Sequence, residues 1–223
     1  MSIYREVKYN FFIFSIEGSI GSGKSTVIDG LKKIANDIVV CYKEEVNKWE
    51  QEGWLKLYYT TPKRSTLAFQ CRVHQSFFDI YRRMRNKLKA GVTKQIVVER
   101  SSYSAQKIFT KHALRAGLID VDEYNFLKNI SKQKQGVHPH IFIYIKTNVD
   151  KCLERIKKRG RQDEQKIDIG YLEDIDRLHN EVFTESRGDV RIVDGNQPAE
   201  KVLFDVWNII NKELTTLFPK FYE

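Results

Sequence analysis

Residues 11–26 read FFIFSIEGSIGSGKST, an apolar run that leads directly into a glycine-rich loop. The loop, residues 18–25, matches the pattern G-x-x-x-x-G-K-[ST]; it follows a predicted strand and opens a predicted helix, as the pattern requires. Glycines let successive backbone N–H groups converge on phosphate oxygens, and the helix N-terminus adds its dipole. Lys24 supplies positive charge to the terminal phosphates, and the Ser25 hydroxyl can ligate Mg²⁺. The loop predicts nucleoside triphosphate binding but does not identify the phosphoryl acceptor.

β-rich runs alternate with helical segments along the whole chain. The β-rich runs are 11–17, 38–42, 95–99, 140–146 and 190–194. The segments with helical periodicity are 24–35, 45–59, 65–88, 101–116, 121–134, 148–158, 169–185 and 199–217. Strands that alternate with helices predict a parallel sheet covered on both faces. We therefore expect one α/β domain over residues 1–223, with a doubly wound five-stranded parallel sheet of the P-loop NTPase type.

The composition is typical of a globular protein. Apolar residues make up 41% and charged residues 30% of the 223 residues, which argues against a disordered or low-complexity chain. The net charge of +9 suits nucleic acid, an acidic membrane or small polyanions such as nucleotides, while a solvated basic face is the ordinary alternative. The three cysteines are dispersed, and no apolar run approaches the ~20 residues of a membrane span. We expect a cytoplasmic protein with no membrane partner.

Charged residues follow two of the predicted strands, at the edge where parallel sheets bind ligands. Glu44 lies just past residues 38–42, where it can accept the proton of an attacking hydroxyl; alternatively, it stabilises a helix N-terminus. Glu99 and Arg100 lie at the end of the third run. Because burying a charged pair is costly, we favour Mg²⁺ and phosphate binding there over a structural ion pair with a helix cap by Ser101.

A basic stretch and an apolar helix supply the remaining candidates. Residues 155–161 read RIKKRGR and end a predicted helix. Basic side chains there either interact favourably with the negative end of the helix dipole or place several guanidinium groups around one phosphate. Asp163 and Glu164 follow at once, so we expect no nucleic-acid partner. Gln70 lies among apolar side chains at helical spacing; its amide can pair with the edge of a base, although such a face is more often core.

Taken in order, these motifs resemble the deoxyribonucleoside kinase family, which includes deoxycytidine, deoxyguanosine and mitochondrial thymidine kinases and a broad-specificity insect enzyme. The resemblance runs from about residue 11 to the C-terminus. Its motifs are the phosphate loop, Glu44-Glu45-Val46-Asn47-Lys48-Trp49, Phe69-Gln70, Glu99-Arg100-Ser101 and an arginine-rich lid at about 155–168. The resemblance implies a homodimeric kinase that uses ATP and Mg²⁺ to phosphorylate the 5′-hydroxyl of a deoxyribonucleoside for nucleotide salvage.

The resemblance also implies a role for each matching residue. Glu44 would be the general base, and Arg100 would hold it beside the 5′-hydroxyl. Ser25 and Glu99 would hold the metal. ATP would be bound by Gly18, Ser19, Ile20, Gly21, Ser22, Gly23, Lys24, Ser25, Thr26, Arg155, Arg159, Arg161, Asp194, Gly195 and Asn196. The nucleoside would be bound by Trp49, Tyr58, Tyr59, Phe69, Gln70, Val73, Phe77, Arg100, Ala105, Phe109 and Glu164. In that set Gln70 would pair with the base, Phe109 would stack on it, and Tyr59 and Glu164 would bind the sugar 3′-hydroxyl.

Departures from the family pattern bear on the substrate. Glu45 replaces the family's proline and puts a second carboxylate beside Glu44, which can raise the pKa of one of them. Phe77 and Ala105 stand where purine- and deoxycytidine-directed members have Arg and Asp, so we expect a pyrimidine, thymidine first and deoxycytidine second. Two other functions stay open. One is a nucleoside monophosphate kinase of the thymidylate kinase kind, which would need extra cations for the acceptor's phosphate; the other is a non-catalytic P-loop protein that binds ATP.

Overall fold

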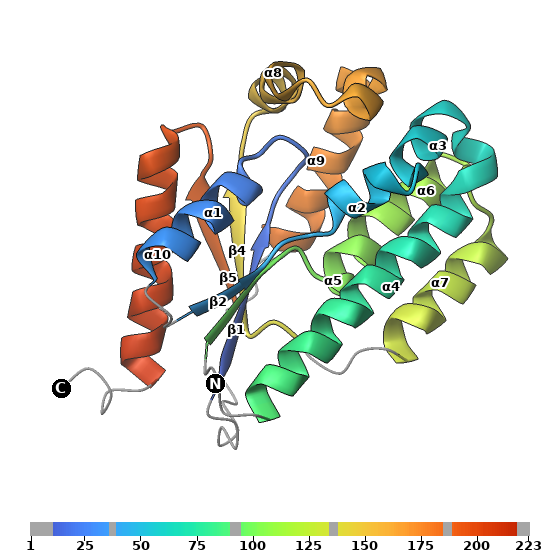
Figure 1. Cartoon of the computed structure of the whole chain (residues 1–223). Coiled ribbons are helices and arrows are strands. Elements are labelled where there is room, and N and C mark those ends of the chain that lie inside the picture. Colours follow the sequence, from blue (N-terminus) through green and yellow to red (C-terminus); the bar gives the residue numbers. More distant parts are fainter. Residues whose placement is uncertain (1–10, 36–38, 90–94, 134–137, 185–188, 218–223) are drawn as a thin grey trace.

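The computed structural model describes residues 11–35, 39–89, 95–133, 138–184 and 189–217. Within them, five parallel strands form one sheet in the order β2-β3-β1-β4-β5 (Figure 1). The strands are β1 (Phe12–Glu17), β2 (Val39–Tyr42), β3 (Gln95–Glu99), β4 (Ile141–Lys146) and β5 (Val190–Asp194). Every residue of β1 and β3 is buried, as the unbroken apolar runs predicted for central strands. The predicted α/β fold is confirmed.

Helices cover both faces of this sheet (Figure 1). On one face α1 (Lys24–Ile34) and α10 (Ala199–Leu217) lie side by side and pack with Phe14 and Ile143 into one core cluster. The other face carries α4 (Pro62–Lys89) and α9 (Ile169–Phe183), and α7 (Val121–Gln133) packs against α4. The central strands β1 and β3 are therefore shielded from solvent on both faces, and ligands have access at the ends of the strands.

The chain between β2 and β3 differs from the prediction. The expected helix 45–59 is two helices, α2 (Val46–Gln51) and α3 (Trp54–Thr60), because Gly53 between them is left-handed (φ 78°) and turns the chain. The helix expected over 65–88 starts at Pro62, a residue suited to a first helical turn. The expected ends at residues 38, 134 and 185 lie outside the described residues.

The helix expected over 101–116 contains a wider turn. It consists of α5 (Ser102–Ser104), a π-helical segment η1 (Ala105–Thr110) and α6 (Lys111–Arg115). The Thr110 hydroxyl donates to the Ala105 carbonyl at 3.1 Å across this turn. Segments of this kind cluster at functional sites, and this one carries two of the predicted nucleoside-binding residues, Ala105 and Phe109.

The parallel register brings the carboxyl ends of the strands to one edge. Glu99 ends β3 opposite Ile16 of β1, and Tyr42 ends β2 opposite Val98 of β3. On the far side, β4 leads into α8 (Val149–Arg159), which is followed by the short 3₁₀ helix η2 (Gln162–Lys166). These connections all emerge at the ligand-binding edge of such a sheet. Within the described residues, we find no helix with the length and apolar character that crossing a membrane requires.

Candidate active site

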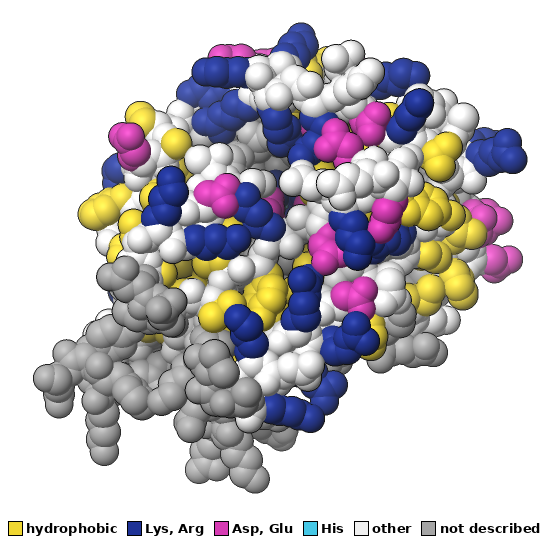
Figure 2. Space-filling model, in the orientation of Figure 1, with side chains coloured by type: hydrophobic (Ala, Val, Ile, Leu, Met, Phe, Trp, Pro, Cys, Tyr) yellow, Lys and Arg dark blue, Asp and Glu magenta, His cyan; other side chains and the backbone are white. Residues whose placement is uncertain are grey.

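A cavity of about 1200 Å³ lies over the carboxyl ends of the strands. Its walls come from the phosphate loop, α2, α3, α4, η1 and the segment from α8 to η2. The predicted site residues that line it are Ile20, Gly21, Ser22, Gly23, Lys24, Ser25, Thr26, Glu44, Trp49, Tyr58, Tyr59, Phe69, Gln70, Val73, Glu99, Arg100, Ala105, Phe109, Arg155, Arg159, Arg161, Glu164 and Gly195. Figure 2 shows Lys and Arg side chains gathered over the upper part of the molecule, around α8, with Asp and Glu side chains among them.

The phosphate loop has the conformation that its glycines permit. Gly21 is left-handed (φ 79°), and a Cβ there would lie 2.4 Å from the Cys152 carbonyl oxygen. The Lys24 ammonium folds back over the loop and donates to the carbonyls of Gly18 (3.0 Å) and Ser19 (2.7 Å). Burial, helped by the nearby Arg100 guanidinium, lowers the pKa of Lys24 to about 7. The lysine therefore gains charge readily when an anion approaches.

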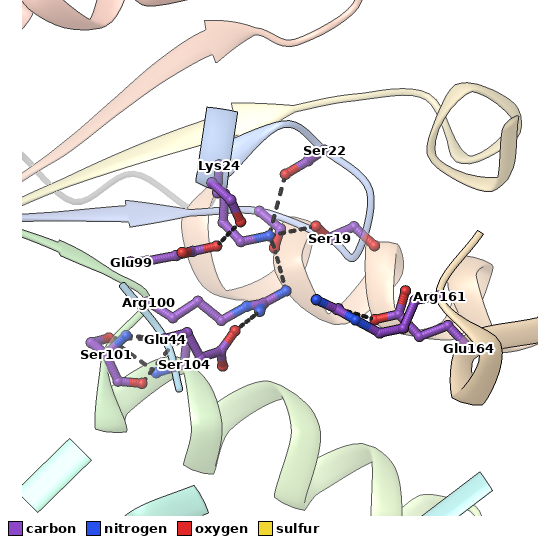
Figure 3. Close-up of polar contacts among 12 residues, drawn as sticks. Ser19, Ser22, Lys24, Glu44, Glu99, Arg100, Ser101, Ser104, Arg161 and Glu164 are labelled. Atoms are coloured by element: carbon purple, nitrogen blue, oxygen red, sulfur yellow. Dashed lines mark hydrogen bonds and ion pairs between the residues drawn. The ribbon is translucent and has the colours of Figure 1, made fainter. Parts of the chain in front are cut away.

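Ser25 and Glu99 meet at the start of α1. The Ser25 hydroxyl donates to Glu99 Oε1 at 2.6 Å, although the two residues are far apart in sequence (Figure 3). Both side chains offer oxygen, which is the donor that Mg²⁺ prefers. Within the described part of the chain, no cluster of three or more His, Cys, Asp and Glu side chains could hold a metal alone. The pair fits a magnesium ion whose remaining ligands come from phosphate and water.

Glu44 and Arg100 form a buried ion pair beside the phosphate loop. Arg100 Nη1 donates to Glu44 Oε2, and each side chain is 7% exposed. Arg100 Nη2 donates to the Gly18 carbonyl at 3.2 Å, so one guanidinium joins the acid to the phosphate loop (Figure 3). Burial raises the pKa of Glu44, and the Arg100 charge opposes the rise. A carboxylate with a raised pKa is a stronger base.

The other end of the cavity is mostly apolar. Trp49, Tyr58 and Phe69 form a cluster of aromatic rings in which the Trp49 ring meets Phe69 edge to face at 5.6 Å. Gln70 is the buried amide in this wall, and its Oε1 lies 3.3 Å from the Thr110 hydroxyl, whose one proton it shares with the Ala105 carbonyl. An oriented amide among apolar walls suits the edge of a planar polar ring.

Phe109 presents a fixed ring to the same space. The Arg100 guanidinium lies 4.9 Å from its centroid on one side, and the His179 ring meets it edge to face at 6.1 Å. Burial lowers the pKa of His179 to about 3, so this support is a neutral ring. Phe109 is therefore held by packing and by a cation–π contact.

The segment around η2 brings two arginines to one carboxylate. Arg161 donates to Glu164 at 2.7 Å (Figure 3). Arg159 donates to the same carboxylate, and Glu164 is buried. Arg161 also reaches α2, where Nη2 donates to Asn47 Oδ1 at 3.0 Å. Arg155 turns the other way and donates to the Ser22 carbonyl at 3.2 Å. The three predicted lid arginines thus all line the cavity; two share Glu164, and the third bonds to the phosphate loop.

Of the three predicted residues in the turn after β5, one lines the cavity. The Asp194 carboxylate accepts from the Asn196 backbone (2.9 Å) and side chain (2.8 Å), so these two residues build the turn and do not line the cavity. Gly195 does line it, and its carbonyl accepts from Arg155 Nη2 at 3.0 Å. A Cβ at Gly195 would lie 2.0 Å from Thr147 Oγ1, so the position has no room for a side chain.

Three other predicted residues also lie away from the cavity surface. Gly18 and Ser19 contribute carbonyls to Lys24 from beneath the loop. Phe77 is 2% exposed and belongs to the core cluster between α4 and the sheet. We therefore correct the expectation that Phe77 helps to bind the nucleoside: it is buried in this core cluster and does not line the cavity.

Several residues of the site escaped the sequence prediction. Tyr171 of α9 lines the cavity, with its hydroxyl 3.5 Å from that of Tyr58. Thr110 orients Gln70, and Glu17 accepts from Ser101 at 2.7 Å beneath Arg100. Each contact joins residues dozens of positions apart, so no local pattern marks it. The sequence placed Glu17 at a strand end expected to border the site but assigned it no role, although a carboxylate at the end of an apolar strand needs a buried partner.

Comparison with known proteins supplies the context for this site. The family model described as Deoxynucleoside kinase matches residues 14–215. A protein of Invertebrate iridescent virus 6 that bears the name "Putative kinase protein 143R" is 34% identical over 204 residues, which are 91% of this chain and 98% of the relative. Thymidine kinase 2, mitochondrial, of Homo sapiens is 31% identical over 175 residues (76% of this chain, 63% of the relative). Deoxycytidine kinase 2 of Gallus gallus is 29% identical over 195 residues (74% and 71%). Thymidine and deoxycytidine kinases are thus both among the relatives.

Proposed function

The chain belongs to the deoxynucleoside kinase family, and we propose that it transfers the terminal phosphoryl group of ATP to the 5′-hydroxyl of a pyrimidine deoxynucleoside. Family membership makes it a phosphotransferase that uses ATP and a nucleoside. The choice of thymidine first and deoxycytidine second is the finer part of the proposal. We also propose that the chain is a single domain, that it forms a homodimer and that it serves nucleotide salvage.

The observation that carries the proposal is the ion pair of Glu44 and Arg100. It lies between the phosphate loop and the apolar end of the cavity, where the acceptor hydroxyl of a nucleoside would meet ATP. A nucleoside monophosphate acceptor would bring a phosphate dianion to this point, and the Glu44 carboxylate would repel it. An alcohol instead gains a base at hydrogen-bonding distance. The site therefore favours a nucleoside over a nucleotide as acceptor.

The proposed mechanism divides the work among few groups. Glu44 accepts the proton of the 5′-hydroxyl as the hydroxyl oxygen attacks the terminal phosphorus of ATP and the bond from that phosphorus to the ADP oxygen breaks, so that ADP leaves. Arg100 keeps the carboxylate turned toward the hydroxyl. Lys24 and the lid arginines stabilise the charge that spreads over the transferring phosphoryl oxygens. Mg²⁺, which Ser25 and Glu99 would hold, neutralises phosphate charge when it is bound. Closure over the cavity keeps water from competing with the sugar alcohol.

Base selection rests on Gln70 and the surfaces around it. An amide offers one acceptor and two donors, so it can pair with the edge of thymine or, after rotation, of cytosine. Ala105 leaves the nearby wall without a charged partner for a purine or an exocyclic amine, which supports a pyrimidine and puts thymidine first. Phe77 does not contribute to base selection, because it faces the core.

A product assay tests the function. The chain is incubated with ATP, Mg²⁺ and each of the four natural deoxynucleosides, and with thymidine monophosphate, and products are separated by chromatography. We expect thymidine 5′-monophosphate in the largest yield and no diphosphate from thymidine monophosphate. Product from the monophosphate alone would assign a monophosphate kinase. ATP binding without any product would assign a binding protein.

A Glu44→Gln variant tests the base. We expect kcat to fall by roughly 10²–10⁴, the usual contribution of a general base, with little change in ATP affinity. Glu154→Gln is the matched control, because Glu154 is an exposed acid on α8. A Glu44→Gln enzyme with kcat close to that of the control would show that Glu44 is not the base.

A further inference from the structure

The backbone at Arg100 is unusual for a side chain of its size. Among the described residues, Arg100 is the one non-glycine residue with a positive φ, at 59°. Such a conformation is unfavourable for a residue with a Cβ, and it persists where surrounding contacts enforce it. Because the guanidinium joins Glu44 to the phosphate loop, the contacts that enforce this turn also determine where the guanidinium lies.

Three consecutive residues of the β1 end each accept one hydrogen bond from the turn. The Arg100 backbone N–H donates to the Ile16 carbonyl at 3.0 Å. The Ser101 hydroxyl donates to Glu17 Oε1 at 2.7 Å, and Arg100 Nη2 donates to the Gly18 carbonyl at 3.2 Å. Glu17 is the one member of this set that accepts with its side chain, so its contact is the one that depends on residue type.

Burial of the Glu17 carboxylate in the interior is energetically unfavourable. Glu17 is 0% exposed, and its Oε2 atom has no hydrogen-bond partner among the described residues. A carboxylate held in this way costs free energy that an apolar residue of the same strand would not. Ser15 also donates to Glu17 Oε1, at 2.7 Å. Glu17 Oε1 thus accepts hydrogen bonds from two hydroxyls, one on its own strand and one in the Arg100 turn.

We propose that Glu17 is a positioning residue for phosphoryl transfer: through Ser101 it holds the Arg100 turn so that the guanidinium lies between Glu44 and the phosphate loop. The proposal rests on the proposed function, in which Arg100 orients the base. Glu17 touches neither substrate in this scheme, since it lies beneath the cavity lining. Its contribution is to kcat, because a small displacement of an aligned group has a large effect on the rate of transfer.

The chain offers two matched controls for Ser101→Ala. Ser15→Ala removes the other 2.7 Å donor to the same Glu17 oxygen but leaves the Arg100 turn intact. Ser104→Ala removes the partner of Ser101 in the α5 capping box, in which each side chain accepts from the other's backbone N–H. Burial raises the pKa of Glu17, and this variant also removes a hydroxyl that opposes the rise, but it leaves the hydrogen bond from Ser101 to Glu17 in place. All three serines are 0% exposed. A general effect of lost buried hydroxyls would therefore appear in all three variants.

The experiment measures steady-state kinetics of the full chain with ATP and thymidine. We expect Ser101→Ala and Glu17→Ala to lower kcat about 10- to 100-fold with the KM for ATP within about threefold, and both control variants to stay within about threefold. Glu17→Gln keeps an acceptor of the same shape and is expected to retain more activity than Glu17→Ala. It replaces Glu17→Ala if that variant does not fold, as judged by circular dichroism.

A double-mutant cycle separates positioning from stability. If Ser101 acts through Arg100, Ser101→Ala costs less than about threefold in an Arg100→Ala background. An equal loss in both backgrounds, or a loss in Ser15→Ala as large as that in Ser101→Ala, would overturn the proposal. Failure of the wild-type chain to phosphorylate any deoxynucleoside would instead refute the proposed function, which is a separate outcome.

Discussion

Lys24 provides a quantitative test of the phosphate site. Its pKa of about 7, against an ordinary value of 10.5, results from burial first and from Arg100 second. At about pH 8.5 a group with this pKa is about 97% neutral. The triphosphate places several negative charges beside the ammonium and raises its pKa above that pH. Binding of ATP at about pH 8.5 is therefore expected to take up about one proton per molecule.

Isothermal titration calorimetry measures this uptake. The binding enthalpy is recorded at about pH 8.5 in two buffers of different ionisation enthalpy, and the slope gives the number of protons. Lys24→Arg is the matched control, because a guanidinium stays protonated at this pH and has no proton to gain. A wild-type uptake below about 0.3 proton, or equal uptake in wild type and Lys24→Arg, would refute the assigned state of Lys24.

The same shift predicts how stability depends on pH. The folded chain binds fewer protons at Lys24 than the unfolded chain between about pH 7 and 10.5, where the unfolded lysine is charged and the folded one is neutral. Stability rises with pH wherever the unfolded state binds more protons. The Lys24 contribution is therefore most unfavourable below about pH 7 and fades toward pH 10.5. In denaturant titrations, the pH dependence over this window is expected to be flatter for Lys24→Met than for wild type.

Three further substitutions test other parts of the site. Ala105→Asp adds an acceptor to the base wall and is expected to shift the kcat/KM ratio from thymidine toward deoxycytidine; an unchanged ratio would remove Ala105 from base selection. Gly195→Ala puts a Cβ 2.0 Å from Thr147 Oγ1 and is expected to raise the KM for ATP several-fold, whereas an unchanged KM would show that the turn yields freely. Ser76→Ala leaves the Trp49 indole N–H, now bonded at 2.8 Å, without its acceptor, and is expected to lower the free energy of unfolding by about 1–3 kcal/mol; no loss in a urea titration would contradict this.

Most of the fold could be predicted from local sequence patterns. The strands and the loop at 18–25 depend on residues close together in sequence, and the alternation of strands and helices leaves few topologies. The break at Gly53 was missed because a glycine inside helical periodicity is compatible with either outcome. The π-helical turn at 105–110 depends on tertiary packing, so periodicity could not reveal it. Sequence patterns therefore predicted the elements better than their irregularities.

The site shows the same division between local and distant information. Glu44, Glu99 and Arg100 were predicted because strand ends of a parallel sheet share one edge. The direction of a side chain depends on how a helix is rotated, and this is why Phe77 was assigned to the cavity although it faces the core. Likewise, Ser101 and Glu17 are far apart in the sequence, and only the folded chain brings the two together.

The net charge of +9 does not reside at the reaction centre. The groups buried there are three carboxylates, Glu17, Glu44 and Glu99, against two cations, Lys24 and Arg100. A centre of this balance does not attract a triphosphate by itself, and the Lys24 charge is further reduced by its low pKa. The attraction must come from a divalent cation and from the arginines around α8 and η2. Neutralising those arginines is thus expected to weaken ATP binding more than it slows the transfer step, whereas changes around Glu17 act on the transfer step alone.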